Sequence, residues 1–271
     1  MPKLEPYLSS SSNSRVKEWA KLTERKHRER EGKFLLEGAH LVEEALRAGW
    51  PVTHVAFDAG AGIPEELAVY AESEQAGTAG PLWVPVSPEV IAKCSSTQTP
   101  QPVFAVAEKK SLPPDKLFDP DAGLVAVLDG VQDPGNVGTI IRSAAACGAT
   151  AVVLGRGTAD VYNAKTLRAT MGALFHVPVT EADLTELLPE ARERGVTVVG
   201  TSLQAAQSCY DYNFRRGVWL VFGSEGGGLS AEVSAAVQDN VIIPITGRAE
   251  SLNVAMAATV LLFEAQRQRM M

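Results

Sequence analysis

The hydrophobic positions of the chain divide into short apolar runs that alternate with amphipathic stretches. From residue 124 onward, the apolar runs predict strands at 124–128, 151–154, 174–179, 196–201, 218–222 and 241–245. The stretches between them predict helices at about 136–147, 163–171, 183–194, 230–238 and 252–268. A continuously apolar strand such as 124–128 is typical of burial on both faces. The pattern therefore predicts an α/β fold with a mostly parallel sheet and helices on both sides.

The pattern before residue 108 predicts a smaller α/β unit. Its expected strands are 34–36, 52–57, 82–86 and 102–107, and its expected helices are 39–48, 64–74 and a short one after Ser87. Nothing in this unit has catalytic spacing, which favours a binding or scaffolding role. The Pro- and charge-rich stretch after it resembles an interdomain linker. We predict a basic helical arm at 1–33, the small unit at 34–108, the linker at 109–120 and the larger domain at 121–271.

Charge is distributed unevenly along the chain. The whole chain carries −7, but residues 1–33 hold nine Lys and Arg against five Glu, a balance of +4, which leaves −11 on the rest. A single helix is expected over Arg15–Arg30, with an apolar stripe of Val16, Trp19 and Leu22. A basic arm on an acidic body can steer a polyanion to one face, although a solvated helix with mixed-sign pairs explains the same charges. The candidate polyanion contacts are Arg15, Lys17, Lys21, Arg25, Lys26 and Arg28.

Several classes of protein do not fit the composition. The chain has no run of about 18 apolar residues, and its first residues lack the basic-then-apolar order of a signal peptide. We therefore expect a cytoplasmic protein that does not span a membrane. Three widely separated cysteines and four histidines show no ligand spacing, so we expect no metal site.

Two loops at the expected carboxyl ends of strands carry candidate chemistry, because ligands of parallel α/β sheets bind at that edge. After strand 124–128, Asn136 can cap the next helix, Gly138 thins its first turn, and Arg142 follows within two turns. The order of residues there differs from the G-x-G-x-x-G of a dinucleotide site. After strand 218–222, Glu225 precedes three glycines that permit close approach of the backbone.

A third loop connects strand 241–245 to the last helix. Ser251 and Asn253 are residue types that cap helix starts, and small residues follow them on the helix. By itself this stretch is equally well explained as an ordinary strand–turn–helix corner.

Taken together and in this order, the three loops resemble the SpoU/TrmH family of S-adenosylmethionine-dependent RNA ribose 2′-O-methyltransferases. The matching residues are Asn136, Gly138 and Arg142 in the first loop, Phe222–Gly226 in the second, and Ile243, Pro244 and Ser251–Asn253 in the third. The stretch Tyr162–Gly172, which includes Arg168, also looks like the family. Residues 34–106 are similar to the ribosomal-protein-like substrate-binding domain that often precedes the catalytic domain.

The resemblance implies a deep trefoil knot in the C-terminal half and a homodimer that packs the knots together. It implies that S-adenosylmethionine contacts Gly223, Ile243, Pro244, Leu252, Thr201, Ser202 and Leu203. It implies catalytic roles for Arg142, Asn136, Glu225, Ser251 and Asn253, with Asn136 and Ser251 or Asn253 orienting Arg142 and the ribose. Arg168 joins the arm as a candidate RNA contact.

The substrate implied by the resemblance is RNA. The front domain and the basic arm favour ribosomal RNA, with transfer RNA as the other possibility. Two other hypotheses stay open at this point. One is a non-catalytic RNA-binding or ribosome-assembly protein that has retained the fold. The other is a methyltransferase that acts on a small molecule or a protein.

Overall fold

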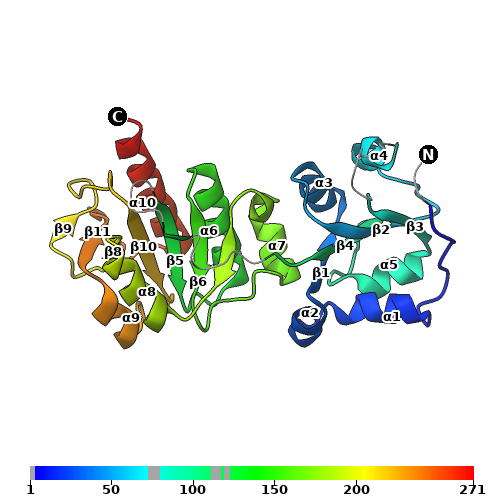
Figure 1. Ribbon diagram of the computed structural model, residues 1–271, viewed down its shortest axis with the longest axis horizontal. Coiled ribbons are helices and arrows are strands. Elements are labelled where there is room, and N and C mark those ends of the chain that lie inside the picture. Colours follow the sequence, from blue (N-terminus) through cyan, green and yellow to red (C-terminus); the bar gives the residue numbers. More distant parts are fainter. Residues whose placement is uncertain (1–3, 73–79, 111–116, 119–122) are drawn as a thin grey trace. The chain divides into compact units, whose positions relative to one another are not determined.

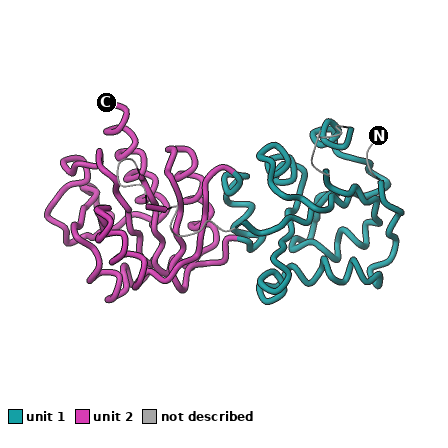
Figure 2. The backbone as a smooth tube through the Cα atoms, viewed as in Figure 1, with its two compact units in different colours: residues 1–110, 162–175 teal, residues 111–161, 176–271 magenta. Residues whose placement is uncertain are grey.

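A computed structural model describes residues 4–72, 80–110, 117–118 and 123–271. The chain forms two compact units, coloured separately in Figure 2. Unit 1 comprises residues 1–110 and 162–175, and unit 2 comprises residues 111–161 and 176–271. The elements are labelled in Figure 1.

Unit 1 contains a four-stranded sheet in the order β1-β4-β2-β3. β4 pairs antiparallel with β1 and β2, whereas β2 and β3 run parallel. The strands are β1 (Lys33–Glu37), β2 (Val52–Asp58), β3 (Leu82–Val86) and β4 (Val103–Glu108). The helices are α1 (Ser14–Lys21), α2 (Arg25–Glu31), α3 (Ala39–Arg47), α4 (Glu65–Glu72), α5 (Pro88–Cys94) and α7 (Ala164–Thr170), with a 3-10 turn η2 (Ala173–Phe175). The predicted small α/β unit is confirmed.

The basic N-terminal segment is part of the core of unit 1. Val16, Trp19 and Leu22 are buried in the same cluster as residues of the sheet, and the Trp19 ring lies 5.6 Å from that of Phe104. The prediction of one helix over Arg15–Arg30 is wrong, because α1 ends at Lys21 and α2 begins at Arg25.

Arg28 explains the break between these helices. Its side chain is buried, and Nη1 donates hydrogen bonds of 2.8 Å to the carbonyl oxygens of Leu22 and Thr23. These carbonyls follow the end of α1 and have no partner within a helix, so a buried guanidinium satisfies them. Arg28 is therefore a buried residue that satisfies main-chain carbonyls, and its contact with RNA stays a prediction. The other candidates of the arm, Lys17, Lys21, Arg25 and Lys26, are exposed.

Unit 2 contains a seven-stranded sheet in the order β7-β6-β5-β10-β8-β11-β9, and every pair in it is parallel. The strands are β5 (Leu124–Asp129), β6 (Ala151–Leu154), β7 (Val179–Glu181), β8 (Thr197–Thr201), β9 (Gln207–Ser208), β10 (Val218–Gly223) and β11 (Asp239–Ile242). The helices are α6 (Pro134–Ala146), α8 (Leu184–Glu193), α9 (Ala231–Ala236) and α10 (Val254–Arg269). The predicted mostly parallel sheet is confirmed.

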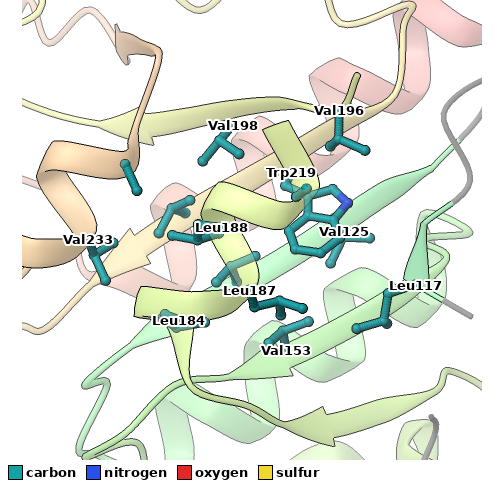
Figure 3. Close-up of a cluster of buried hydrophobic side chains, with 14 of the residues drawn as sticks. Leu117, Val125, Val153, Leu184, Leu187, Leu188, Val196, Val198, Trp219 and Val233 are labelled. Atoms are coloured by element: carbon teal, nitrogen blue, oxygen red, sulfur yellow. The ribbon is translucent and has the colours of Figure 1, made fainter. Parts of the chain in front are cut away.

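Helices cover both faces of this sheet. On one face, Figure 3 shows the leucines of α8 over Trp219 of β10, Val125 of β5 and Val153 of β6. On the other face, α10 packs against α6, β5 and β10. Because both faces are covered, every residue of β5 and β10 is buried, which explains their continuous apolar sequence.

Two details of the sequence prediction differ from the structure. The strand predicted at 174–179 is instead the turn η2 followed by β7 at Val179–Glu181, and the edge strand β9 was not predicted. The segment Tyr162–Phe175 packs in unit 1 because its rings contact that unit. Tyr162 lies 4.6 Å from Phe34 and Phe175 lies 5.2 Å from Trp50.

The predicted linker falls largely on residues 111–116 and 119–122, which lie outside the described residues. Leu117 belongs to the core of unit 2, and the Phe118 ring stacks on Trp219 at 5.6 Å. The boundaries of the four predicted segments stay a prediction. So does the knot, which the order of the strands does not establish.

The role of Arg28 is tested by Arg28→Ala. This variant leaves two carbonyl oxygens without a charged donor, so we expect it to lower the free energy of unfolding by about 2–3 kcal/mol. Lys26→Ala on the same helix removes an exposed side chain and should change it by no more than about 0.5 kcal/mol. Urea unfolding of the full chain measures both. Equal stability of the two variants would contradict the role given to Arg28.

Candidate functional site

Three loops meet at the carboxyl-terminal edge of the parallel sheet in unit 2. They follow β5, β10 and β11, and the end of β8 lies between the last two strands. Two of the loops open directly into α6 and α10, so their polar residues lie at helix starts. The sheet therefore brings together three segments that are far apart in sequence.

The loop after β10 folds back on itself over a few residues. The Ser224 N–H donates to the Gly228 carbonyl at 2.9 Å, and the Gly228 N–H donates to the Ser224 carbonyl at 3.0 Å. Gly228 has a φ of +66°, which favours glycine. A Cβ on Gly223 would overlap the Gly228 carbonyl group and the Leu229 nitrogen. Position 223 therefore requires glycine, because the main chain of Gly228 and Leu229 passes too close to it for a Cβ atom.

Hydrogen bonds between side chains join the three loops. Asn136 at the start of α6 donates from Nδ2 to Glu225 Oε1 at 2.8 Å. Asn253 at the start of α10 donates from Nδ2 to Asn136 Oδ1 at 3.1 Å. Its own Oδ1 accepts from the Ala255 N–H at 2.9 Å and caps α10, as predicted. The sequence prediction placed these three residues in one site, and the structure brings them into contact.

Asn136 does not cap α6, which corrects one expectation. Asp133 is the capping residue and accepts from the Asn136 N–H at 3.0 Å, with Pro134 following it. Proline lacks an N–H and fits the first position of a helix, so the helix begins two residues earlier than expected. This frees the amide of Asn136 for Glu225 and Asn253.

Glu225 is held by the neighbouring loop. The N–H groups of Gln132 and Asp133 each donate to its carboxylate at 3.3 Å. Partial burial raises the pKa of Glu225, but the hydrogen bonds from Asn136 and from main-chain N–H groups outweigh this effect and leave the pKa below its usual value. The carboxylate is therefore ionised at neutral pH and accepts hydrogen bonds without carrying a proton.

A cavity of about 470 Å³ is lined by the end of β8, by the loops after β10 and β11 and by the start of α10. Its size falls within the ~300–1,000 Å³ typical of sites for small molecules and cofactors. Most of the residues predicted to contact a cofactor line it, namely Gly223, Ile243, Leu252, Thr201, Ser202 and Leu203. Glu225, Ser251 and Asn253 also line it. Pro244 does not, although its neighbours Ile243 and Ile245 do.

The cavity contains residues that the sequence analysis did not single out. Val241, Ile242, Ile245 and Leu261 contribute to its wall. Gln132 and Asp133 act on the site through main-chain N–H groups. Main-chain contributions leave no side-chain signature, so only the glycine-rich composition of the loop indicated them.

Arg142 lies apart from this hydrogen-bond network. It is exposed on α6, and in the part of the chain that the structure describes no hydrogen bond or ion pair joins it to another residue. The expectation that Asn136, Ser251 or Asn253 orients Arg142 is not met, because Asn136 bonds to Glu225 and Asn253 instead. Its guanidinium is available to a ligand.

The described residues were also compared with what a metal site, a membrane span or a reactive thiol requires. No group of three or more His, Cys, Asp or Glu among them is arranged to hold a metal ion. None of the described helices is both long and apolar enough to span a membrane. Cys94, Cys147 and Cys209 are buried free thiols, and burial raises the pKa of each.

Comparison with known proteins identifies the larger domain. Residues 123–263 match the SpoU rRNA methylase family, and this match covers more than half of the chain. The chain belongs to the SpoU rRNA methylase family. Residues 13–105 match the MRM3-like substrate binding domain. The family and the enzyme class expected from the three loops are confirmed.

Relatives similar over their whole length support this membership in the SpoU family. The chain is 38% identical over 256 residues to the 23S rRNA (guanosine(2553)-2′-O)-methyltransferase RlmP of Bacillus subtilis, covering 94% of this chain and 97% of that one. It is 32% identical over 268 residues to a 23S rRNA (uridine(2479)-2′-O)-methyltransferase of Streptomyces viridochromogenes, covering 96% and 92%. The crystal structure of an AdoMet-bound rRNA methyltransferase from Sinorhizobium meliloti matches with a TM-score of 0.84 at 32% identity, covering 98% of both chains.

The approach of the main chain at Gly223 is tested by Gly223→Ala. The added Cβ forces the Ser224–Gly228 loop away from β10, so we expect binding of S-adenosylmethionine to fall by at least about tenfold. Gly227→Ala is the matched control, because its Cβ would meet only the Ser224 hydroxyl, at 3.2 Å. Titration calorimetry measures both, and retained affinity in Gly223→Ala would contradict the prediction.

Proposed function

We propose that this protein transfers the methyl group of S-adenosylmethionine to a ribose 2′-hydroxyl of ribosomal RNA. The proposal rests chiefly on the cavity lined by the loops after β10 and β11. Beside it, Asn136 of the first loop bonds to Glu225 and Asn253 of the other two, and all three residues match the SpoU family. The two relatives described above are named for two different nucleotides of 23S rRNA, which favours ribosomal RNA without specifying a nucleotide.

The residues of the cavity suit S-adenosylmethionine. Its wall combines aliphatic side chains such as Ile243 and Leu252 with main-chain groups of two glycine-containing loops. Aliphatic side chains can enclose an adenine ring, and exposed main-chain groups can bond to its edge. When bound, the cofactor would supply a methyl group from a positively charged sulfur, and the ribose hydroxyl that receives it would give up its proton to a phosphate of the RNA or to water.

Arg142 is the residue that we assign to the RNA at the point of reaction. A guanidinium is always protonated in proteins, so Arg142 cannot act as a general base. Its planar fork of donors instead suits a phosphate next to the target ribose and stabilises negative charge that develops on the 2′ oxygen. Glu225 and Asn136 act as positioning residues that hold the loops in register.

Unit 1 would bind the RNA substrate, as its match to a substrate binding domain suggests. Exposed cations on α1 and α2, including Lys17, Lys21 and Lys26, provide an electrostatic contribution to this binding. Arg15 pairs with Glu5 at 3.3 Å and Arg25 lies 4.0 Å from Glu29, so these two are partly neutralised. We place the reaction in the cytoplasm, where ribosomal RNA is processed in bacteria.

The proposed function is tested in cells that lack the gene. Mapping of 2′-O-methyl groups should reveal one missing mark in ribosomal RNA, which the wild-type gene restores. Arg142→Ala should not restore the mark, although the purified variant should bind S-adenosylmethionine as the wild type does. Arg142→Lys keeps the charge but not the planar guanidinium, so it should restore the mark partly. An unchanged methylation map would reject the function, and full restoration by Arg142→Ala would reject the role of the arginine.

A homodimer is the assembly that we propose, and α10 offers the surface for it. Met256, Phe263 and Met270 are 54%, 43% and 79% exposed and lie seven residues apart, so they share one face of the helix. A row of exposed apolar side chains is typical of an interface between proteins.

This assembly is tested by sedimentation velocity. Phe263→Asp places a charge in the proposed interface and should convert a dimer to a monomer. Val69→Asp, at an exposed apolar position on α4 of unit 1, should leave the dimer intact. A monomeric wild type, or a dimer in both variants, would rule out this interface.

A further inference from the structure

A second cavity lies in unit 1, separate from the one lined by the loops after β10 and β11. Its volume is about 190 Å³, and it is lined by residues of the α1–α2 turn, β1, the loop after α5 and α7. Three cations line it, Arg28, Lys165 and Arg168, against the single carboxylate of Glu37. A protein with a net charge of −7 thus gathers positive charge around one small hollow.

Two of these cations, Lys165 and Arg168, lie on α7, which packs in unit 1. Thr166 and Leu167 are buried, whereas Lys165 and Arg168 are exposed and lie three residues apart, next to each other on one face. Before the helix, the Tyr162 hydroxyl donates to the Lys110 carbonyl at 3.0 Å, and Asn163 caps the helix by accepting from the Lys165 N–H at 2.8 Å. These contacts fix the start of the helix that carries both cations.

The contacts that hold the Arg168 side chain involve one nitrogen of its guanidinium, Nη1. Nη1 donates to Ser96 Oγ at 3.0 Å and lies 3.6 Å from Glu37 Oε2. Glu37 in turn accepts from the Ser96 N–H and the Ser95 hydroxyl, both at 3.0 Å. A guanidinium carries five N–H donors, so the contacts through Nη1 leave others for a ligand. Fixed donors of this kind bind phosphate oxygens with little loss of side-chain freedom.

The size of the cavity indicates what fits in it. It is smaller than the ~300–1,000 Å³ typical of sites that enclose a whole small molecule. It has room for roughly six waters at ~30 Å³ each, which matches a fragment of a larger ligand. In RNA, the fragment that carries both negative charge and hydroxyl groups is a ribose with its phosphate.

We propose that this cavity binds a ribose-phosphate unit of the substrate RNA, with Lys165 and Arg168 as the phosphate-binding residues and Glu37 positioning Arg168. The proposal rests on the proposed function, since it assigns a contact for the same RNA. Lys165 and Arg168 lie within the segment that matches the SpoU methylase model, yet they pack in the unit that matches the substrate-binding model. The substrate-binding surface of unit 1 is therefore completed by a helix from the methylase segment (Figure 2).

Binding of the full-length protein to deproteinised 23S rRNA from cells lacking the gene tests this site as a function of salt. Lys165→Ala with Arg168→Ala should weaken binding about tenfold and lower the slope of log affinity against log salt by about 1–2, because one or two phosphate contacts are lost. Lys93→Ala removes an exposed cation of α5 outside the cavity and serves as the control. Affinity for S-adenosylmethionine, measured by calorimetry, should be unchanged in all of them.

Two further variants separate a phosphate contact from a structural role. Lys165→Ala alone alters only an exposed side chain and should lower the salt slope by about 1, whereas Lys165→Arg keeps the charge and should keep the slope. If the wild type binds and methylates the RNA but the double variant matches Lys93→Ala, the cavity proposal fails and the proposed function stands. If the wild type neither binds nor methylates the RNA, both fail.

Discussion

The close approach of two main-chain segments at Gly223 is the constraint on which the rest of the site depends. The end of β10 runs directly against Gly228, so the loop between them must turn tightly and has no room for a side chain at position 223. This turn places Glu225 where Asn136 and the N–H groups of the β5–α6 loop reach its carboxylate. Asn253 then adds the start of α10 to the same network. One steric requirement thus aligns three loops.

The hydrogen-bond network also keeps the carboxylate of Glu225 ionised. Glu225 remains ionised because it accepts hydrogen bonds from Gln132, Asp133 and Asn136, which lie at or near the start of α6. The Glu225 carboxylate thus joins the start of α6 to the glycine loop, and Asn136 in turn joins it to the start of α10. The cavity beside this network is lined by glycines and aliphatic side chains together with polar residues such as Glu225, Ser251 and Asn253.

The sequence predicted the larger features of the fold because they follow from periodicity. Continuous apolar runs such as β5 and β10 indicated a sheet buried on both faces, and the loops at its carboxyl edge indicated the site. Features set by single contacts escaped prediction. The break between α1 and α2 depends on the buried Arg28, and the packing of Tyr162–Phe175 in unit 1 depends on ring contacts with Phe34 and Trp50. Neither leaves a repeating pattern in the sequence.

The sequence predicted which residues form the candidate site better than it predicted the contacts between them. Asn136, Glu225 and Asn253 were expected to act together, and their hydrogen bonds show how they do so. Their relation to Arg142 was misjudged, since residue types alone do not reveal which of two polar neighbours an amide contacts. The cavity in unit 1 could not be predicted at all, because it is assembled from the α1–α2 turn, β1, the loop after α5 and α7.

Amide hydrogen exchange with and without S-adenosylmethionine tests most directly the claim that the three hydrogen-bonded loops respond together to one cofactor. The account predicts that binding slows exchange together in residues 132–136, 223–228 and 243–255, while the amides of α7 and β1 in unit 1 are unaffected. Protection confined to one of the three loops, or absent from all of them at saturating cofactor, would contradict it.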